Sequence, residues 1–178
     1  GNELITYAAF SGVGKSTLAV NFSWCLATRL QQKVLVIDMD PQFNATQCLL
    51  NPEQYMEHKQ QNKDTILSIF SDQSLQVSSV DGAKPTVPKE LKDIELVTLD
   101  ENLFLLPGDL SLHRIEMASG DGREFKLQRY LEANTHHKFD YVIIDTPPTP
   151  SIWMSSALIA SNYYIIPLKP DPLSVTGI

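Results

Sequence analysis

One stretch of the sequence decides the fold: Ala9-Phe10-Ser11-Gly12-Val13-Gly14-Lys15-Ser16-Thr17. Its spacing fits a phosphate-binding loop, with a hydroxyl residue directly after Lys15, although Ala9 replaces the usual first glycine. Gly12 and Gly14 let the backbone turn its N–H groups toward phosphate oxygens, because neither residue carries a Cβ. The stretch therefore predicts a site for a nucleoside phosphate.

The residues of this loop have separable roles. Lys15 places a positive charge on the outer phosphates, where it also assists their transfer, and Ser16 offers its hydroxyl to Mg²⁺. The helix expected to follow directs the positive end of its dipole at the same anion. We predict that the nucleotide is bound by Ser11, Gly12, Val13, Gly14, Lys15, Ser16 and Thr17.

The flanking sequence supports the same interpretation. Residues 4–8 have the pattern of a buried strand, and residues 33–38 have the pattern of a second one. Between them Leu18, Phe22 and Leu26 recur at the spacing of one helix face, with Cys25 on the same helix as an expected buried thiol. Strand, loop, helix and strand together predict a βαβ unit.

Acidic residues follow two of the expected strands. Asp145 ends the apolar run 142–145, and ligands of open α/β sheets lie at that end of the strands, so we predict that it supports Mg²⁺. Asp38 and Asp40 end the second strand, and Pro41 indicates that the chain leaves the sheet there. Beside Mg²⁺ and phosphate, one of these two carboxylates would support the water shell of the metal and the other would orient the attacking water.

The rest of the chain alternates between helix and strand patterns. Helices are expected near residues 44–50, 53–61, 64–70, 110–118, 123–134 and 151–160, and strands at 94–99, 103–106, 139–145 and 163–167. Residues 71–91 are rich in Ser, Gln, Asp, Pro and Gly, which predicts an exposed connection. The alternation predicts an α/β fold of the P-loop NTPase type, a mostly parallel sheet with helices on both faces.

Composition narrows the class of protein. The chain has 178 residues, 43% of them hydrophobic, and no apolar run approaches the roughly 18 residues of a membrane span. Two cysteines without metal spacing favour a reducing cytoplasm. The net charge of −7 arises after residue 50, and no basic patch for a nucleic-acid backbone is visible. Trp24 and Trp153 fall on helix patterns that predict core or interface positions.

Taken in order, these motifs resemble the ParA/MinD superfamily of deviant Walker A P-loop ATPases, and most closely its ParA-type partition ATPases. Residues 38–46, Asp-Met-Asp-Pro-Gln-Phe-Asn-Ala-Thr, resemble switch I of that family, and residues 145–148, Asp-Thr-Pro-Pro, resemble switch II. Residues 103–108 and 165–177 are similar to its later strands and loops. The resemblance implies one ATPase domain over residues 1–178 that lacks the carboxyl-terminal portion of a typical member.

Two positions depart from the family pattern. Phe43 stands where glycine is usual in switch I, and Phe10 stands where the family has the first lysine of its loop. In the family that lysine reaches the phosphates of the partner across an ATP-dependent dimer. A phenyl ring offers no charge, so we expect slow hydrolysis and a weak dimer unless another basic residue supplies the charge.

The resemblance implies an ATPase that uses ATP and Mg²⁺ as a dimerisation switch in plasmid or chromosome partition or in cargo positioning. We assign the metal to Ser16, Asp38 and Asp145, and catalysis to Lys15 and Asp40. The implied partners are a second copy of the chain, a ParB-like centromere-binding or adaptor protein, and DNA through residues outside this chain, with no membrane.

Three alternatives stay open at this point. A P-loop kinase or a dethiobiotin-synthetase-like ligase would use the same loop, but such an enzyme has no need of the Asp-Pro-Gln-x-Asn switch. A nitrogenase-reductase-like electron carrier needs cysteine ligands at its dimer axis, and only Cys25 and Cys48 exist. A module that holds ATP with little turnover is the alternative that Phe10 makes serious.

Overall fold

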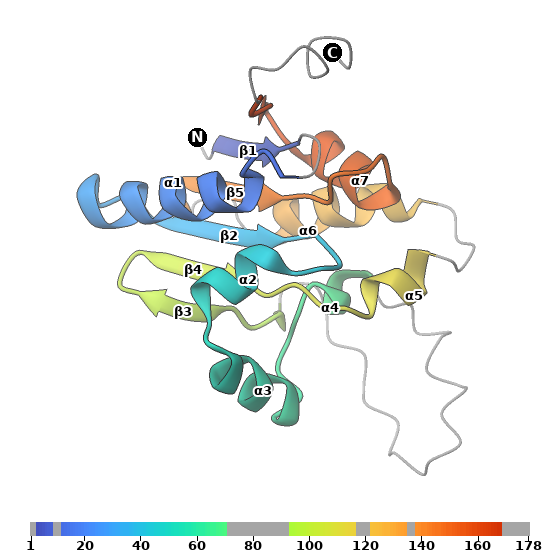
Figure 1. Ribbon diagram of the computed structural model, residues 1–178, viewed down its shortest axis with the longest axis horizontal. Coiled ribbons are helices and arrows are strands. Elements are labelled where there is room, and N and C mark those ends of the chain that lie inside the picture. Colours follow the sequence, from blue (N-terminus) through green and yellow to red (C-terminus); the bar gives the residue numbers. More distant parts are fainter. Residues whose placement is uncertain (1–2, 9–11, 71–92, 117–121, 135–137, 169–178) are drawn as a thin grey trace.

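The structure is a computed structural model that describes residues 3–8, 12–70, 93–116, 122–134 and 138–168 (Figure 1). Several of the sequence-based predictions lie outside these residues. They concern Phe10 and Ser11 of the loop, the connection 71–91 and the loop at 174–177. These remain predictions.

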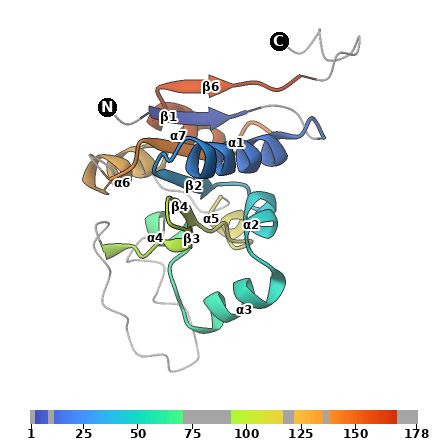
Figure 2. The same cartoon turned by 90° about the vertical axis from the view of Figure 1, so that its left-hand side faces the viewer.

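One six-stranded sheet forms the centre of the molecule, in the order β3-β4-β2-β5-β1-β6 (Figure 2). Its strands are β1 Glu3–Tyr7, β2 Val34–Asp38, β3 Val97–Asp100, β4 Leu103–Leu106, β5 Tyr141–Asp145 and β6 Tyr163–Ile165. All neighbours pair in parallel except β3, which is antiparallel to β4. The predicted mostly parallel α/β sheet is confirmed, although β3 begins three residues later than the predicted strand.

The register of the three central strands brings their carboxyl ends to one edge. Asp38 at the end of β2 pairs with Asp145 at the end of β5, and Tyr7 at the end of β1 pairs with Asp145 from the other side. Both carboxylates are completely buried. Because parallel strands end together, the loops that follow β1, β2 and β5 meet at the same edge of the sheet.

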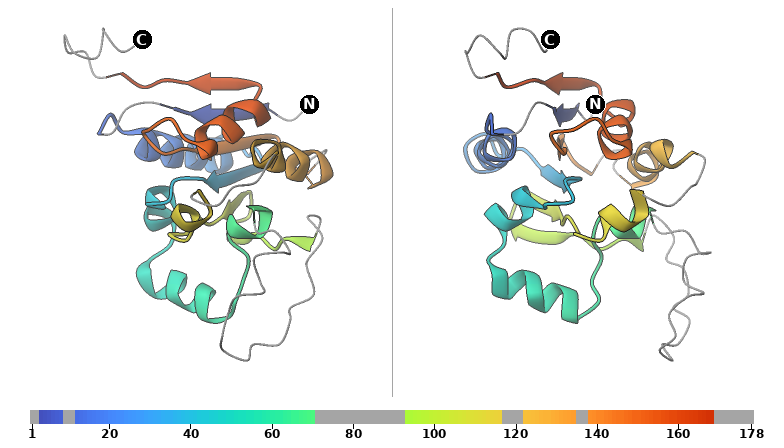
Figure 3. Two further views of the ribbon diagram at one scale, coloured as in Figure 1. Left: turned by 90° about the vertical axis from the view of Figure 1, so that its right-hand side faces the viewer. Right: turned by 45° about the vertical axis from the view of Figure 1, so that its right-hand side comes forward.

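Helices cover both faces of the sheet, with α1 on one face and α6 and α7 on the other (Figure 3, right). The helices are α1 Lys15–Arg29, α2 Asn44–Leu49, α3 Pro52–Gln60, α4 Leu67–Phe70, α5 Leu112–Glu116, α6 Lys126–Asn134 and α7 Ile152–Ala160, with a 3-10 turn η3 at Arg123–Phe125. Side chains alternate along β2, so that Leu35 and Ile37 join the core under α6 and α7, while Val34 and Val36 join the core under α1. Among the described residues, none of the helices is long and apolar enough to cross a membrane.

The buried face of α1 differs from the predicted one. Leu18, expected in the core, is 42% exposed, whereas Ala19 and Ser23 are completely buried. Small side chains let the helix axis approach the sheet closely, so the packed face is centred one residue further along the helix. The same rotation exposes Trp24 and Cys25, so the prediction of a buried thiol is wrong, and of the core or interface position predicted for Trp24 only the interface remains a prediction. Trp153, in contrast, is completely buried on α7 as predicted.

Candidate functional site

The first turn of α1 is built to receive an anion. Gly12 has φ 77° and Gly14 has φ 88°, a left-handed conformation that favours glycine. Among the described residues no atom lies within 4 Å of where a Cβ would stand at either glycine, and no side chain caps the helix. The N–H groups of the first turn therefore remain available to an anion, as the sequence predicts.

A cavity of about 510 Å³ opens in front of this turn. It collects residues from the ends of three strands and from the start of two helices: Gly12, Gly14, Lys15, Ser16, Thr17, Asp40, Gln42, Asn44, Gln47, Cys48 and Pro148. The structure thus brings the phosphate-binding loop, the loop after β2 and the loop after β5 to one opening. Gln47 and Cys48, which no sequence motif indicated as lining residues, reach it because α2 starts directly after the β2 loop.

Lys15 and Asp40 line this cavity, and the buried carboxylate of Asp145 lies close enough to both to interact with their charges. Lys15 is only 7% exposed, and burial lowers the pKa of its ammonium against the attraction of the Asp145 and Asp40 carboxylates. Burial raises the pKa of Asp145 to about 6, and the charge of Asp40 adds to the rise. The Ser16 hydroxyl, the Lys15 charge and the backbone amide of Thr146 counteract it. The predicted Lys15, Ser16, Asp40 and Asp145 are therefore neighbours.

Asp145 fits a ligand for a cation. The Ser16 hydroxyl is near enough to lower its pKa, yet neither carboxylate oxygen has a hydrogen-bond partner among the described residues. A buried carboxylate without donors is costly unless a cation or bound water satisfies it. In the described part of the chain, no group of three or more His, Cys, Asp or Glu side chains is arranged to hold a metal ion. Mg²⁺ is usually bound by one or two protein oxygens together with substrate phosphates and water.

Asp38 is engaged differently from Asp145. Its Oδ2 accepts hydrogen bonds from the backbone N–H and the hydroxyl of Thr46, both at 2.7 Å, and its Oδ1 accepts one from the N–H of Asp40 at 3.1 Å. Burial and the charge of Asp145 raise the pKa of Asp38 to about 8, although the Thr46 and Asp40 donors oppose this rise. Asp38 therefore holds the loop after β2 to the start of α2, and its predicted part in the metal site stays a prediction.

Asp40 lies on the cavity side of the same loop. It is 4% exposed, and its Oδ1 accepts a hydrogen bond from the N–H of Gln42 at 2.8 Å. This bond uses one oxygen and fixes the turn that Pro41 begins. The arrangement places a carboxylate in the cavity beside Lys15, where a bound phosphate and its attacking water would lie.

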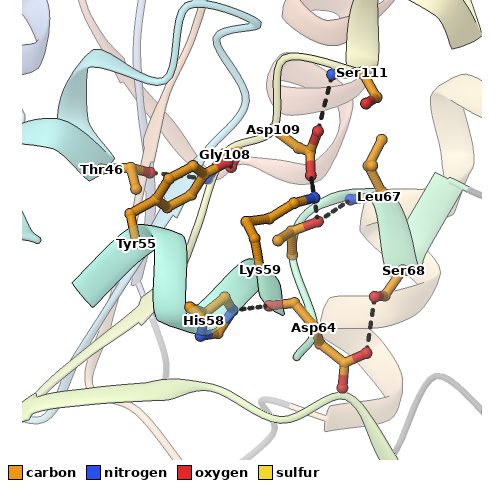
Figure 4. A network of polar contacts seen from close by, with 11 residues as sticks. Thr46, Tyr55, His58, Lys59, Asp64, Leu67, Ser68, Gly108, Asp109 and Ser111 are labelled. Atoms are coloured by element: carbon orange, nitrogen blue, oxygen red, sulfur yellow. Dashed lines mark hydrogen bonds and ion pairs between the residues drawn. The ribbon is translucent and has the colours of Figure 1, made fainter. Parts of the chain in front are cut away.

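Behind this loop, a set of polar contacts connects three segments (Figure 4). The Thr46 hydroxyl accepts a hydrogen bond from the N–H of Gly108 at 2.8 Å, and the Tyr55 hydroxyl donates to the carbonyl of Gly108 at 3.0 Å. Lys59 of α3 forms an ion pair with Asp109. Thr46, Tyr55 and Asp109 were not predicted as site residues, although Thr46 ends the 38–46 motif and Pro107-Gly108-Asp109 marks the turn after β4.

Comparison with known proteins agrees with this geometry. Residues 4–178 match the AAA_31 family, described as an AAA domain. The chain is 32% identical over 169 residues to the sporulation initiation inhibitor protein Soj of Bacillus subtilis, which covers 94% of this chain and 58% of Soj. It is 30% identical to the cell division protein PomZ of Myxococcus xanthus, covering 94% of this chain and 46% of PomZ.

Solved structures show the same likeness. A plasmid partition protein from Borrelia burgdorferi bound to AMPPNP superposes with a TM-score of 0.75 at 28% identity, covering 98% of this chain and 66% of that one. Cobyrinic acid a,c-diamide synthase from Mycobacterium smegmatis, with an ATP analogue and magnesium, superposes with a TM-score of 0.72 at 26% identity, covering 100% of this chain and 64% of that one.

This chain therefore spans a little over half of the length of Soj and about half of PomZ. Within that span this chain has a phosphate-binding loop sequence, two strands that end in aspartate and a mostly parallel sheet. The chain belongs to the AAA_31 family and is a member of the ParA/MinD-type P-loop ATPases.

Proposed function

We propose that this chain binds Mg²⁺–ATP and hydrolyses it slowly, as a nucleotide-dependent dimerisation switch in plasmid or chromosome partition or in cargo positioning. The observation that carries the proposal is the unpartnered Asp145 carboxylate. It is buried near Lys15 and Ser16, which line the cavity at the first turn of α1. The plasmid partition protein that superposes on this chain holds AMPPNP, which supports ATP as the ligand.

Each part of the site then has a physical task. The amides of residues 12–17 and the Lys15 ammonium bind the phosphates, with Ser11 completing the loop. Ser16 and Asp145 hold Mg²⁺, and Asp38 stabilises its surroundings from β2. When bound, Mg²⁺ would neutralise charge on the outer phosphates. Asp40 orients the attacking water, because its carboxylate faces the same cavity.

The proposed partners are based on the likeness to known proteins, because the residues that line the cavity do not identify a partner. Soj and PomZ are named for sporulation inhibition and cell division, and the superposed structure for plasmid partition. We infer that this chain pairs with a second copy when ATP is bound and responds to a ParB-like or cargo-adaptor protein. Contact with DNA, through residues other than the acidic sequence after residue 50, belongs to the same proposal.

The alternative of a small-molecule kinase or ligase has less support. The likeness to cobyrinic acid a,c-diamide synthase shows that the framework also serves such enzymes. The sequence relatives Soj and PomZ, in contrast, are named for sporulation and cell division. The loop of residues 38–46 is bound to Gly108 and α2, an arrangement suited to a switch segment.

The test of ATP binding is calorimetry on Lys15→Ala. Loss of the buried ammonium should weaken Mg²⁺–ATP binding at least tenfold, about 1.4 kcal/mol, because this charge faces the outer phosphates. Lys33→Ala is the matched control. Lys33 immediately precedes β2, at the amino-terminal edge of the sheet, and its ammonium lies over the Phe104 ring. Unchanged ATP affinity in Lys15→Ala would refute the nucleotide site.

The dimerisation switch has a separate test. Light scattering and phosphate release are measured with and without ATP for the parent and for the double variant Phe10→Lys, Ser11→Gly. We expect the double variant to form a tighter ATP-dependent dimer or to hydrolyse ATP faster, because a lysine would place charge on the phosphates of the partner. Equal dimerisation and equal turnover would show that another basic residue already fills this role.

A further inference from the structure

The loop after β2 contains a residue in a strained backbone conformation. Phe43 has φ 43° and ψ 43°, the left-handed region, and it is the residue that precedes the first turn of α2. Side chains with a Cβ rarely adopt this conformation, because the Cβ approaches the following carbonyl oxygen. Such strain persists when the surroundings hold the residue in place.

The surroundings include a second aromatic ring. The Phe43 ring stacks on the Tyr55 ring of α3, with centroids 5.0 Å apart and planes inclined by 18°. The Tyr55 hydroxyl donates a hydrogen bond to the carbonyl of Gly108. Burial raises the pKa of Tyr55 to about 12, and the charges of Asp109 and Asp38 add to the rise, so the hydroxyl keeps its proton at neutral pH.

Gly108 lies against both Phe43 and Asp38. A Cβ at this position would stand 2.6 Å from the Phe43 Cβ and 3.0 Å from the Asp38 Cγ, so a side chain here would overlap both residues. The N–H of Gly108 donates to the Thr46 hydroxyl, which in turn donates to Asp38. The turn that contains Gly108 is anchored at its next residue. The Asp109 carboxylate accepts hydrogen bonds from the Lys59 ammonium, the Thr65 hydroxyl and the N–H of Ser111 (Figure 4).

The residues on either side of Phe43 face the other way. Gln42 and Asn44 line the nucleotide cavity, whereas Phe43 between them packs on α3. The N–H of Gln42 is also the donor that fixes the Asp40 carboxylate. A movement of Phe43 would therefore displace Asp40 and the cavity wall together, because these residues are consecutive in one short turn.

We propose that Phe43 and Tyr55 are positioning residues: their stacked rings hold the loop of residues 38–46 so that the Asp40 carboxylate faces the nucleotide. The pair acts from behind the loop and touches neither phosphate nor metal. In this chain a ring that packs on α3 stabilises the left-handed turn. The inference about turnover rests on the proposed ATPase function, whereas the inference about the loop does not.

The loop is tested first without nucleotide, by amide hydrogen exchange resolved by residue. In Phe43→Ala the N–H groups of Gln42 and Thr46 should exchange at least about tenfold faster, because their acceptors are no longer held. Tyr55→Leu, which loses the ring and the hydroxyl, should have the same effect. Tyr55→Phe keeps the ring, so it should stay within about threefold of the parent.

The control is Phe104→Leu. Phe104 pairs with Leu35 in the first half of β2 and packs edge-on against Phe139, with ring centroids 5.4 Å apart, so the substitution removes an aromatic contact that involves neither Phe43 nor Tyr55. We expect this variant to lose stability but to leave the exchange of Gln42 and Thr46 within about twofold of the parent. Equal exchange in Phe43→Ala and in the control would overturn the proposal.

Turnover gives the second measurement. Phe43→Ala and Tyr55→Leu should lower kcat for ATP about tenfold while KM changes less than about twofold, because Asp40 acts after the nucleotide is bound. Tyr55→Phe should restore most of kcat. A fall in kcat no larger than in Phe104→Leu would overturn the positioning role. A parent that binds no ATP would disprove the proposed function alone, and the exchange measurement would still decide whether the pair holds the loop.

Discussion

Two loops at the same edge of the sheet place residues at positive φ, and they do so by opposite means. The phosphate-binding loop uses Gly12 and Gly14, and no described atom lies within 4 Å of where their Cβ atoms would be. The loop after β2 uses Phe43 at φ 43°, with its ring stacked on Tyr55 and its Cβ against Gly108.

The difference follows from what each loop must face. A ligand has to reach the backbone N–H groups of the first loop, so the conformation that creates the site must leave the space empty. The second loop presents its carboxylate on one side and is held by protein on the other, so its strained residue fills space. In these two loops, the open space at positive φ lies on the side from which the proposed nucleotide would approach, and the filled space lies where protein holds the chain.

The largest expected effect distinguishes ATP binding, assigned to the phosphate-binding loop, from ATP turnover, assigned to the loop after β2. Asp40→Ala should lower the turnover of bound ATP about 10²-fold, the usual scale for loss of a positioned base, and should leave ATP affinity nearly unchanged. Single-turnover phosphate release and calorimetry on the same variant measure the two quantities. Loss of ATP binding with normal turnover per bound nucleotide would show that Asp40 is structural.

The next effect concerns the filled space behind the second loop. Gly108→Ala should reduce the free energy of unfolding by about 1–3 kcal/mol, because the new Cβ overlaps the Phe43 Cβ. Adding Phe43→Gly should recover part of this loss, and the contact with Asp38 should retain the rest. Urea denaturation of the two single variants and the double variant gives the coupling.

Gly122→Ala is the control for that experiment. Gly122 has φ 78° and no described atom within 4 Å of its Cβ position, so its substitution adds backbone strain without an overlap. Phe43→Gly should therefore not recover any stability in the Gly122→Ala background. Additive losses at Gly108 and Phe43 would contradict the packing that distinguishes the second loop.

A smaller effect is expected in the pH dependence of stability, through the buried carboxylate of Asp145. The pKa of Asp145 is raised to about 6 in the folded protein, against about 3.9 in an unfolded chain, so the folded state binds more protons between these values. The stability of the nucleotide-free protein should consequently fall as pH rises from 5 to 7, with Asp145 contributing about 1 kcal/mol of the loss. Thermal unfolding at the two pH values measures it.

Asp145→Asn should remove this part of the pH dependence, and Mg²⁺ with ATP should reduce it in the parent, because a bound cation favours the ionised carboxylate. Asp109→Asn is a contrasting variant, since hydrogen bonds from Lys59 and Ser111 hold the pKa of Asp109 below its usual value despite burial. An unchanged slope in Asp145→Asn would mean that Asp145 is not the titrating group.

The smallest effect is expected from Phe43→Gly alone. Relief of the left-handed strain contributes about 1–2 kcal/mol of stability, whereas loss of the stacked ring costs about 0.5–1.5 kcal/mol and glycine adds about 0.5–1 kcal/mol of chain entropy. The free energy of unfolding should thus change by less than about 1 kcal/mol in urea denaturation. A loss well above that would show that the ring stabilises more than its own turn.

The sequence predicted the fold because its signals are local and repeated. A glycine-rich loop between two β-branched strands and an acidic residue at the end of a third specify parallel strands whose carboxyl ends meet. The structure has Lys15, Asp40 and Asp145 close together at that edge, as this reasoning requires. Element ends were less accurate: helix α5 begins at Leu112 and not near residue 110.

The errors have a common physical origin. On α1 the choice between the Leu18 and the Ala19 face depends on how closely the helix approaches the sheet, and small residues decide that distance without an apolar signal. Tyr55 was missed for a similar reason, because its contacts with Phe43 and Gly108 join segments that are far apart in the sequence. No local pattern records such a contact.

The packing at Gly108 has an evolutionary consequence. Positions 43, 55 and 108 are constrained as a set: a side chain at 43 requires the absence of one at 108, and an aromatic at 55 gives a ring at 43 a surface to stack on. Glycine at 43 would remove the overlap with position 108 but not the contact with Asp38, so position 108 would stay restricted while position 55 could vary. We therefore expect substitutions at 43 and 55 to be correlated among relatives, and position 108 to stay glycine wherever Asp38 is present.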